Sequence, residues 1–446
     1  MTATDAILPD RAPGRLTADV ADPILARRAG RIWWACLALF LALTVLMVVS
    51  LTVLAVSGVG IWGINTSAVW GFAIVNYVWW IGIGNAGTLI SAMLLLTRQR
   101  WRTSINRFAE AMTLFAACIA GLFPIFHLGR PWLFYWLVPY PNTMGLVPQW
   151  RSPLVWDLFA IASYILFSLM FWYTGAIPDF ATLRDRARGR LTRAACGILA
   201  LGWRGSARHW QVWQGYYGAM AAMGVPLVIS VHSVVGMDYS AGLAPGWNET
   251  IFPPYFVVGA MFSGFAMVVV LAAIFRRALG VPHMITDRHF DIIGKVLLAG
   301  SLVMTVSYAT EWFYAWYSGE PAEQRIVAVQ LWGDYWPLYW GMLAGNCILP
   351  QLYWVPWCRR TLWVTVPVAI AINIGMWLER VVITVVPPTR GYLPSQWGSY
   401  WPTFWDWALF AGTLGFFGLL FTLFLRVIPA VSMHELKEQV DEEVRA

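Results

Sequence analysis

The sequence predicts an all-α protein that crosses a membrane about ten times. Apolar residues make up 59% of its 446 residues and charged residues only 12%, and the mean hydropathy is +0.60. Soluble domains are closer to a quarter charged. The apolar residues gather into runs of roughly 20, the length that a helix needs to cross a bilayer core. Such runs are too long and too evenly apolar for barrel strands.

Ten runs of this kind follow one another along the chain. Their approximate bounds are 32–56, 72–96, 108–127, 153–174, 214–235, 254–275, 291–316, 335–357, 362–386 and 405–428. Because the number of crossings is even, both ends of the chain are expected on one side of the membrane.

Basic residues are distributed unevenly between the two sides. Of the 30 Lys and Arg residues, only Arg130, Arg151, Arg325 and Arg390 fall on the loops opposite the termini, and Arg380 falls inside a run. All the others lie on the side of the termini. Basic loops stay in the cytoplasm, so this asymmetry predicts cytoplasmic termini. The net charge of +7 then reports topology, and nucleic acid is not an expected partner.

The chain ends and the cysteines carry few functional signals. Residues 1–31 are polar and lack the apolar core of a signal peptide, so a cytoplasmic tail is expected. The last run is followed by a short acidic segment, within region 388–446. The five cysteines form no CxxC, no CxxCH and no zinc spacing. No iron–sulfur cluster and no c-type haem is therefore expected in this chain.

The runs contain an internal repeat. "NYVWWIGIGNAG" opens the second run and "PPYFVVGAMFSG" the sixth, while Pro-Leu-x-Trp opens both the fourth and the eighth. Pro226 and Pro367 each precede an acid by twelve residues, Asp238 and Glu379. This pattern predicts two parallel four-helix bundles, 72–235 and 254–387, joined by an outer loop at 236–253. Segment 32–71, with the first helix, and the last helix lie outside them. The alternative is that Gly and Pro simply recur in apolar helices.

Ionisable residues inside the runs are the strongest candidates for function, because burying them in a membrane is costly. His127 ends the third run and Asp157 lies about one turn into the fourth. Antiparallel neighbours would bring both to the same depth, where a carboxylate orients an imidazole and raises its basicity. The alternative is that both are solvated at the interface.

The loop between them, 128–152, is rich in Trp, Tyr and Pro and includes Arg130 and Trp132. Such a loop fits an aromatic belt at the lipid headgroups. It also fits the roof of an apolar pocket for a flat aromatic ligand.

Further polar residues lie at comparable depth. They are His232, Asp238, Glu311, Asp334, Glu379 and Arg380. Glu379 and Arg380 are direct neighbours that point to different helix faces and need not pair. Together these residues suggest an internal polar track or cavity.

Several motifs resemble the NrfD/PsrC-like membrane subunits, and most closely the ActC-type quinol-binding subunit of bacterial alternative complex III. They are "GWNETIFPPYFVVGAMFSGFAMV", "EWFYAWYSG", "GDYWPLYW" and "HLGRPW", within the ten-helix layout. The resemblance covers the second to the tenth run. It implies a chain without metal centres that binds a quinol near the periplasmic face and passes its electrons to an iron–sulfur partner. The quinol would be menaquinol or ubiquinol.

The resemblance also implies residue roles and partners. His127 and Asp157 would be the catalytic proton acceptors, with Arg130, Trp132, Glu311 and Arg390 bordering the quinol. The partners would be a periplasmic iron–sulfur subunit, a homologous NrfD-like subunit, c-type cytochromes and a terminal oxidase, within membrane lipid. His232, Asp238, Asp334, Glu379 and Arg380 would form a proton path.

Three alternatives remain at this level. The chain is an ActF-like sibling, or another NrfD-like subunit of a molybdopterin or iron–sulfur oxidoreductase. It is a haem b protein that uses His127 and His232. Or it is a transporter without a redox role, which the repeat and the polar track would also suit.

Overall fold

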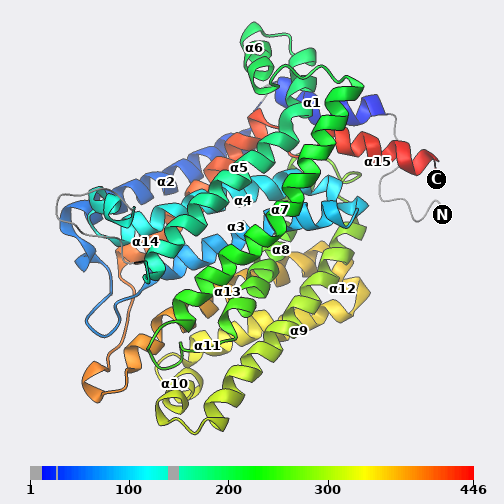
Figure 1. The fold of residues 1–446 in the computed structure, drawn as a ribbon. Helices are drawn as coiled ribbons and strands as arrows, with labels where there is room; N and C mark the ends of the chain where they lie inside the picture. Colours follow the sequence, from blue (N-terminus) through cyan, green and yellow to red (C-terminus); the bar gives the residue numbers. More distant parts are fainter. Residues whose placement is uncertain (1–12, 27–28, 139–149, 446) are drawn as a thin grey trace.

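The computed structural model describes residues 13–26, 29–138 and 150–445, and helices dominate these residues (Figure 1). The helices are α1 (Pro13–Leu25), α2 (Arg31–Ser57), α3 (Phe72–Leu96), α4 (Asn106–His127), α5 (Pro153–Arg186), α6 (Arg190–Leu199), α7 (Ala207–Ser240), α8 (Phe252–Ala278), α9 (Asp287–Tyr317), α10 (Pro321–Trp332), α11 (Trp336–Leu343), α12 (Pro356–Arg360), α13 (Leu362–Val385), α14 (Phe404–Val427) and α15 (Met433–Arg445). No strand occurs in these three ranges. The predicted all-α class is confirmed, although residues 1–12 and 27–28 of the predicted tail lie outside the description.

Nine of the described helices are long and apolar enough to cross a membrane, so this is a multi-pass membrane protein. They are α2, α3, α4, α5, α7, α8, α9, α13 and α14. Nine of the ten predicted runs thus correspond to one continuous helix each.

The eighth predicted run, 335–357, is interrupted instead. After α11 the chain makes a π-helical turn, η5 (Ala344–Ile348), then the 3-10 segment η6 (Leu349–Trp354), and then α12. Pro350 causes the break because it has no N–H to donate to the carbonyl of Asn346, four residues earlier. The Ser301 hydroxyl of α9 donates to that carbonyl instead, at 2.6 Å.

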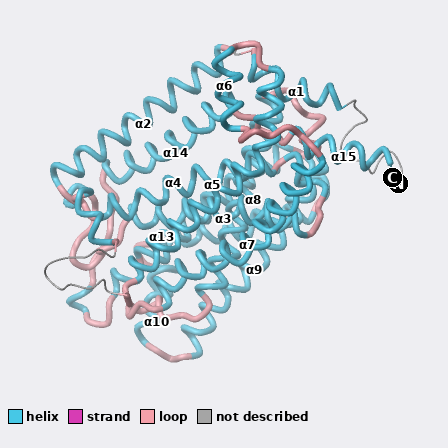
Figure 2. Tube along the Cα trace, turned by 45° about the horizontal axis from the view of Figure 1, so that its top comes forward, coloured by secondary structure: helices cyan, strands magenta, loops and turns pink. Residues whose placement is uncertain are grey.

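The long helices form two bundles and a lateral pair. Helices α3, α4, α5 and α7 contact one another in a ring, which we call the first bundle. Helices α8, α9, α11–α12 and α13 form the second bundle, and α3 contacts α8 and α13 across the boundary. Helices α2 and α14 pack together beside α3 and α4 (Figure 2).

Helix α3 is the centre of the molecule, with 89% of its most apolar stretch buried against 17% for α2. Small residues allow this close packing. A Cβ on Gly87 would collide with the backbone of Ala109 in α4, and one on Gly264 of α8 would collide with Ala86 of α3.

Both ends of the described chain lie at one end of the bundle, which we call the terminal end (Figure 1). There α1 packs on α15, and α15 also contacts η3 (Arg100–Ser104), the 3-10 segment between α3 and α4. The opposite end, the far end, holds α10 and the 3-10 segments η4 (Pro131–Leu137) and η7 (Pro387–Arg390).

Candidate functional site

Asp157 is buried in the first bundle, but its partners are not the ones that the sequence suggested. Asp238 of α7 and Tyr77 of α3 lie close enough to act on its carboxylate electrostatically. The Tyr77 hydroxyl and the Oδ1 atoms of both aspartates have no hydrogen-bond partner among the described residues. The exposed fractions of Asp157 and Asp238 are 5% and 8%. Neither aspartate forms an ion pair with Lys or Arg among the described residues. We call Tyr77, Asp157 and Asp238 the aspartate cluster.

His127 ends α4 at the far end, as the sequence predicted, and its side chain is largely enclosed. No ion pair or hydrogen bond joins His127 to Asp157 in the described part of the chain. The buried Nδ1 of His127 likewise has no hydrogen-bond partner there. Arg130 and Trp132 follow on η4 and both are exposed. Residues 139–149 of the predicted roof, which spans 128–152, lie outside the described residues.

His232 lies at the boundary between the two bundles. Its Nδ1 contacts the side-chain amide of Asn85 on α3, and its ring is only 1% exposed. Its Nε2 lies near Gly82 and Ser263, so that a Cβ on Gly82 would come within 3.9 Å of that nitrogen. Arg380, on α13, is close enough for its positive charge to influence the His232 ring. The ring is therefore enclosed between α3 and α8, which is an unfavourable place for a haem ligand.

Glu379 of α13 is the centre of a second polar group. Its carboxylate accepts from the hydroxyl of Tyr308 and is 3.4 Å from the amide nitrogen of Asn346, which donates to Tyr308 at 2.8 Å. Sequence adjacency left the pairing of Glu379 and Arg380 open, and in the structure they form an ion pair with an Nη1–Oε1 distance of 2.9 Å. The guanidinium also lies 4.1 Å from the centre of the Phe256 ring. We call Tyr308, Asn346, Glu379 and Arg380 the glutamate cluster.

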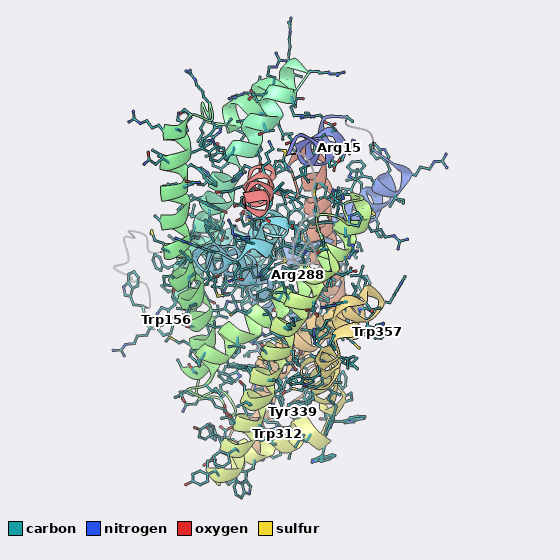
Figure 3. The ribbon with its side chains drawn as sticks, turned by 90° about the vertical axis from the view of Figure 1, so that its right-hand side faces the viewer. Arg15, Trp156, Arg288, Trp312, Tyr339 and Trp357 are labelled. Atoms are coloured by element: carbon teal, nitrogen blue, oxygen red, sulfur yellow. The ribbon has the colours of Figure 1, made fainter. Side chains whose placement is uncertain are left out.

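A narrow cavity connects the glutamate cluster to the far end. Its lining includes the carboxylates Glu249, Glu311, Glu323 and Glu379 and the hydroxyls of Tyr255, Tyr308 and Tyr339. Its volume is about 30 Å³, which is room for one or two water molecules. Trp312 and Tyr339 close one wall, and the indole donates to the tyrosine hydroxyl at 2.5 Å (Figure 3). Glu311, which the resemblance assigned to the border of the quinol, also lines this cavity.

The mouth of this cavity holds two acids on connecting segments. Glu249 lies in the loop before α8, and Glu323 lies on α10, where it accepts from the backbone of Gly246 at 2.8 Å. Burial and the nearby Glu323 carboxylate raise the pKa of Glu249 to about 7. Burial also raises the pKa of Glu323.

Asp334 and Arg390 lie apart from both clusters. They form an ion pair with an Nη2–Oδ2 distance of 3.0 Å, and the Asp334 side chain is 58% exposed. Arg390 also donates to the carbonyls of Thr389 and Gly398. These contacts join the segments that follow α10 and α13.

Sequence reasoning missed several members of these clusters. Tyr77, Tyr308 and Asn346 lie in apolar helices, where Tyr and Asn usually indicate packing. Glu249 was part of a quoted motif without a role. Its signal was an acid next to an aromatic, proline-rich helix start.

No group of three or more His, Cys, Asp or Glu side chains suited to a metal occurs among the described residues. No curated protein matches the chain significantly. The family described as polysulphide reductase, NrfD, matches residues 61–387, which spans both bundles and both clusters. The chain therefore belongs to the NrfD family, the membrane subunits of quinone-interacting oxidoreductase complexes.

Proposed function

We propose that this chain is the quinol-binding subunit of a respiratory quinol-oxidising complex of the alternative complex III type. The observation that carries the proposal is the aspartate cluster, in which two buried carboxylates lie beside a buried phenol and no Lys or Arg pairs with them among the described residues. Two neighbouring carboxylates in a low-dielectric interior hold a proton between them rather than ionising together. Such a group can accept and release a proton during turnover.

The proposed reaction is the oxidation of a hydroquinone to a quinone. The hydroquinone gives two electrons to an iron–sulfur partner and two protons to this chain. His127, whose buried Nδ1 has no partner among the described residues, accepts one proton as general base. Asp157 accepts the other and shares it with Asp238. Arg130 and Trp132 border the ring from the exposed side of η4.

The second bundle supports proton movement rather than quinol binding. Its cavity is too narrow for a quinone ring but wide enough for water, and four carboxylates line it. We assign proton exchange with the periplasm to Glu249, Glu311 and Glu379, with Arg380 as the counter-ion of Glu379.

The proposed orientation places the terminal end in the cytoplasm and the far end in the periplasm of a bacterial inner membrane. Arginines concentrate at the terminal end, as basic loops do on the cytoplasmic side. The far end would then meet the periplasmic iron–sulfur subunit. An NrfD-like sibling, c-type cytochromes and a terminal oxidase complete the proposed assembly.

The test is quinol oxidation by the complex purified with its partners. We expect His127→Ala to lower turnover by on the order of 10²–10⁴, the usual cost of losing a general base. The matched control is His209→Ala, which removes a histidine at the terminal end. Near-normal turnover of an intact complex with His127→Ala would overturn the assignment. Reporter fusions that placed the 241–251 loop in the cytoplasm would overturn the orientation.

A further inference from the structure

A basic pocket of about 500 Å³ lies at the terminal end, where α3 ends and α7 begins beside α15. Three arginines line it, Arg98, Arg100 and Arg102, together with Gln99, Thr103, Gln214 and the aromatic pair Trp213 and Tyr217. The two aromatic rings stack with their centres 4.9 Å apart. Because α3 and α7 cross the membrane, the pocket lies at the depth of lipid headgroups. Neither cluster described above includes any of its residues.

Arg98 occupies a backbone position that normally belongs to glycine. Helix α3 ends in a Schellman motif, in which the N–H of Arg98 donates to the carbonyl of Leu95 and that of Gln99 to the carbonyl of Leu94. The residue after the cap has left-handed dihedral angles in this motif, and Arg98 has φ +53°. A side chain there costs free energy that glycine would avoid. The strain points to a use for the guanidinium.

Arg102 provides a second, independent sign of a ligand. Its residue surface is only 8% exposed. Its Nη2 pairs with Glu435 of α15 at 3.0 Å, whereas the buried Nη1 has no hydrogen-bond partner among the described residues. A buried guanidinium nitrogen without an acceptor is costly, and a bound anion would satisfy it.

The charges around the pocket favour an anion. Two carboxylates, Glu435 and Glu438, also line it. Glu435 is committed to Arg102 and to the amide of Asn106, while Glu438 is exposed. The three guanidiniums therefore outnumber the carboxylates. Planar guanidiniums bind phosphate oxygens in pairs, and basic pockets between helix ends are typical sites for anionic headgroups.

We propose that this pocket binds a phosphate group, held by Arg98 and by Nη1 of Arg102, with Trp213 and Tyr217 as its apolar wall. The phosphate comes either from an anionic lipid of the adjacent leaflet or from a soluble phosphate compound. The site does not depend on the proposed quinol chemistry.

The test uses the thermal stability of the full chain in detergent, with added phosphatidylglycerol, phosphatidylcholine or inorganic phosphate. Arg98→Gly relieves the strained backbone and removes the charge. Without ligand, we expect this variant to melt at the same temperature as the parent or higher. With phosphatidylglycerol, we expect the parent to gain stability and the variant to bind roughly fivefold more weakly, the factor that one basic side chain contributes near an anionic surface.

Three controls separate the outcomes. Arg98→Lys keeps the charge and should retain most of the response. Arg277→Ala removes an exposed arginine from the end of α8, outside the pocket, and should respond like the parent. Leu201→Gly relieves the other strained side chain, at φ +46°, without changing charge.

An effect of inorganic phosphate alone identifies a soluble ligand, and an effect of phosphatidylglycerol alone identifies a lipid. Equal responses of Arg98→Gly and the parent to every ligand would overturn the site.

Discussion

The two bundles hold their buried acids in different ways. In the first, Asp157 and Asp238 face each other and Tyr77, with no Lys or Arg paired to them among the described residues. In the second, Glu379 has a guanidinium at 2.9 Å and accepts from a tyrosine. The repeat places Asp238 and Glu379 at matching positions after a proline, yet their neighbours differ.

This difference shows that acids at matching helix positions can have different neighbours and therefore different chemistry. Two carboxylates without a cation form a proton acceptor, because only one of them ionises readily. A carboxylate with an adjacent guanidinium has a counter-ion for its charged form. We therefore expect amide substitutions in the two bundles to differ in both activity and stability.

The largest expected effect is on turnover. Asp157→Asn should slow quinol oxidation by on the order of 10²–10⁴, because the amide cannot accept a proton. Glu379→Gln should leave the KM for quinol within about twofold and act, if at all, on proton coupling. Steady-state kinetics of the purified complex measure both. A quinol or inhibitor bound between α9 and α11, with the first bundle empty, would reverse the comparison.

The second effect is on stability, and its sign should differ between the bundles. Glu379→Gln leaves Arg380 buried without a counter-ion, which costs on the order of 3–5 kcal/mol. Asp157→Asn removes one of two buried carboxyl groups that do not ionise together and should leave the melting temperature unchanged or higher. Thermal unfolding of both variants in one detergent tests this. The double variant Glu379→Gln with Arg380→Met should recover part of the loss, and further destabilisation would contradict the ion-pair argument.

The fold was predictable because hydropathy reports burial in lipid directly. The apolar runs, their order and the uneven placement of the arginines can be read along the sequence, and the predicted all-α class is confirmed. The partners of Asp157 were not predictable. The position of a residue within its apolar run indicates its depth in the membrane. Asp157, Asp238 and His127 were therefore all placed near one end. Which of them meet depends on how each helix is rotated, and tyrosines such as Tyr77 give no distinct signal in apolar helices.

A smaller effect is expected on the pH dependence of stability at the mouth of the cavity. Burial and Glu323 raise the pKa of Glu249 from its ordinary value of 4.5 to about 7. The folded chain therefore binds more protons than the unfolded chain in this window, and stability should fall as pH rises from about 4.5 to about 7. Melting temperatures measured across that range should decline less in Glu249→Gln. Glu320→Gln, on the exposed residue before α10, is the control and should keep the parent's slope.

The smallest expected effect concerns the break in the second bundle that positions Asn346 beside Glu379. Pro350 leaves the carbonyl of Asn346 without its helical donor, and Ser301 supplies one at 2.6 Å. Ser301→Ala should therefore cost about 1–3 kcal/mol, because a buried carbonyl loses its hydrogen bond. In a Pro350→Ala background the alanine N–H can donate to the same carbonyl, so the same Ser301→Ala change should cost less. A double-mutant cycle measures this difference as a coupling energy of about 1 kcal/mol.

Additive effects would show that Ser301 does not compensate for Pro350, and the π-helical turn would then need another cause. The first bundle has no counterpart, because α5 is continuous through Asp157. Coupling of this kind would show that Ser301 compensates for Pro350 at the turn that places Asn346 beside Glu379.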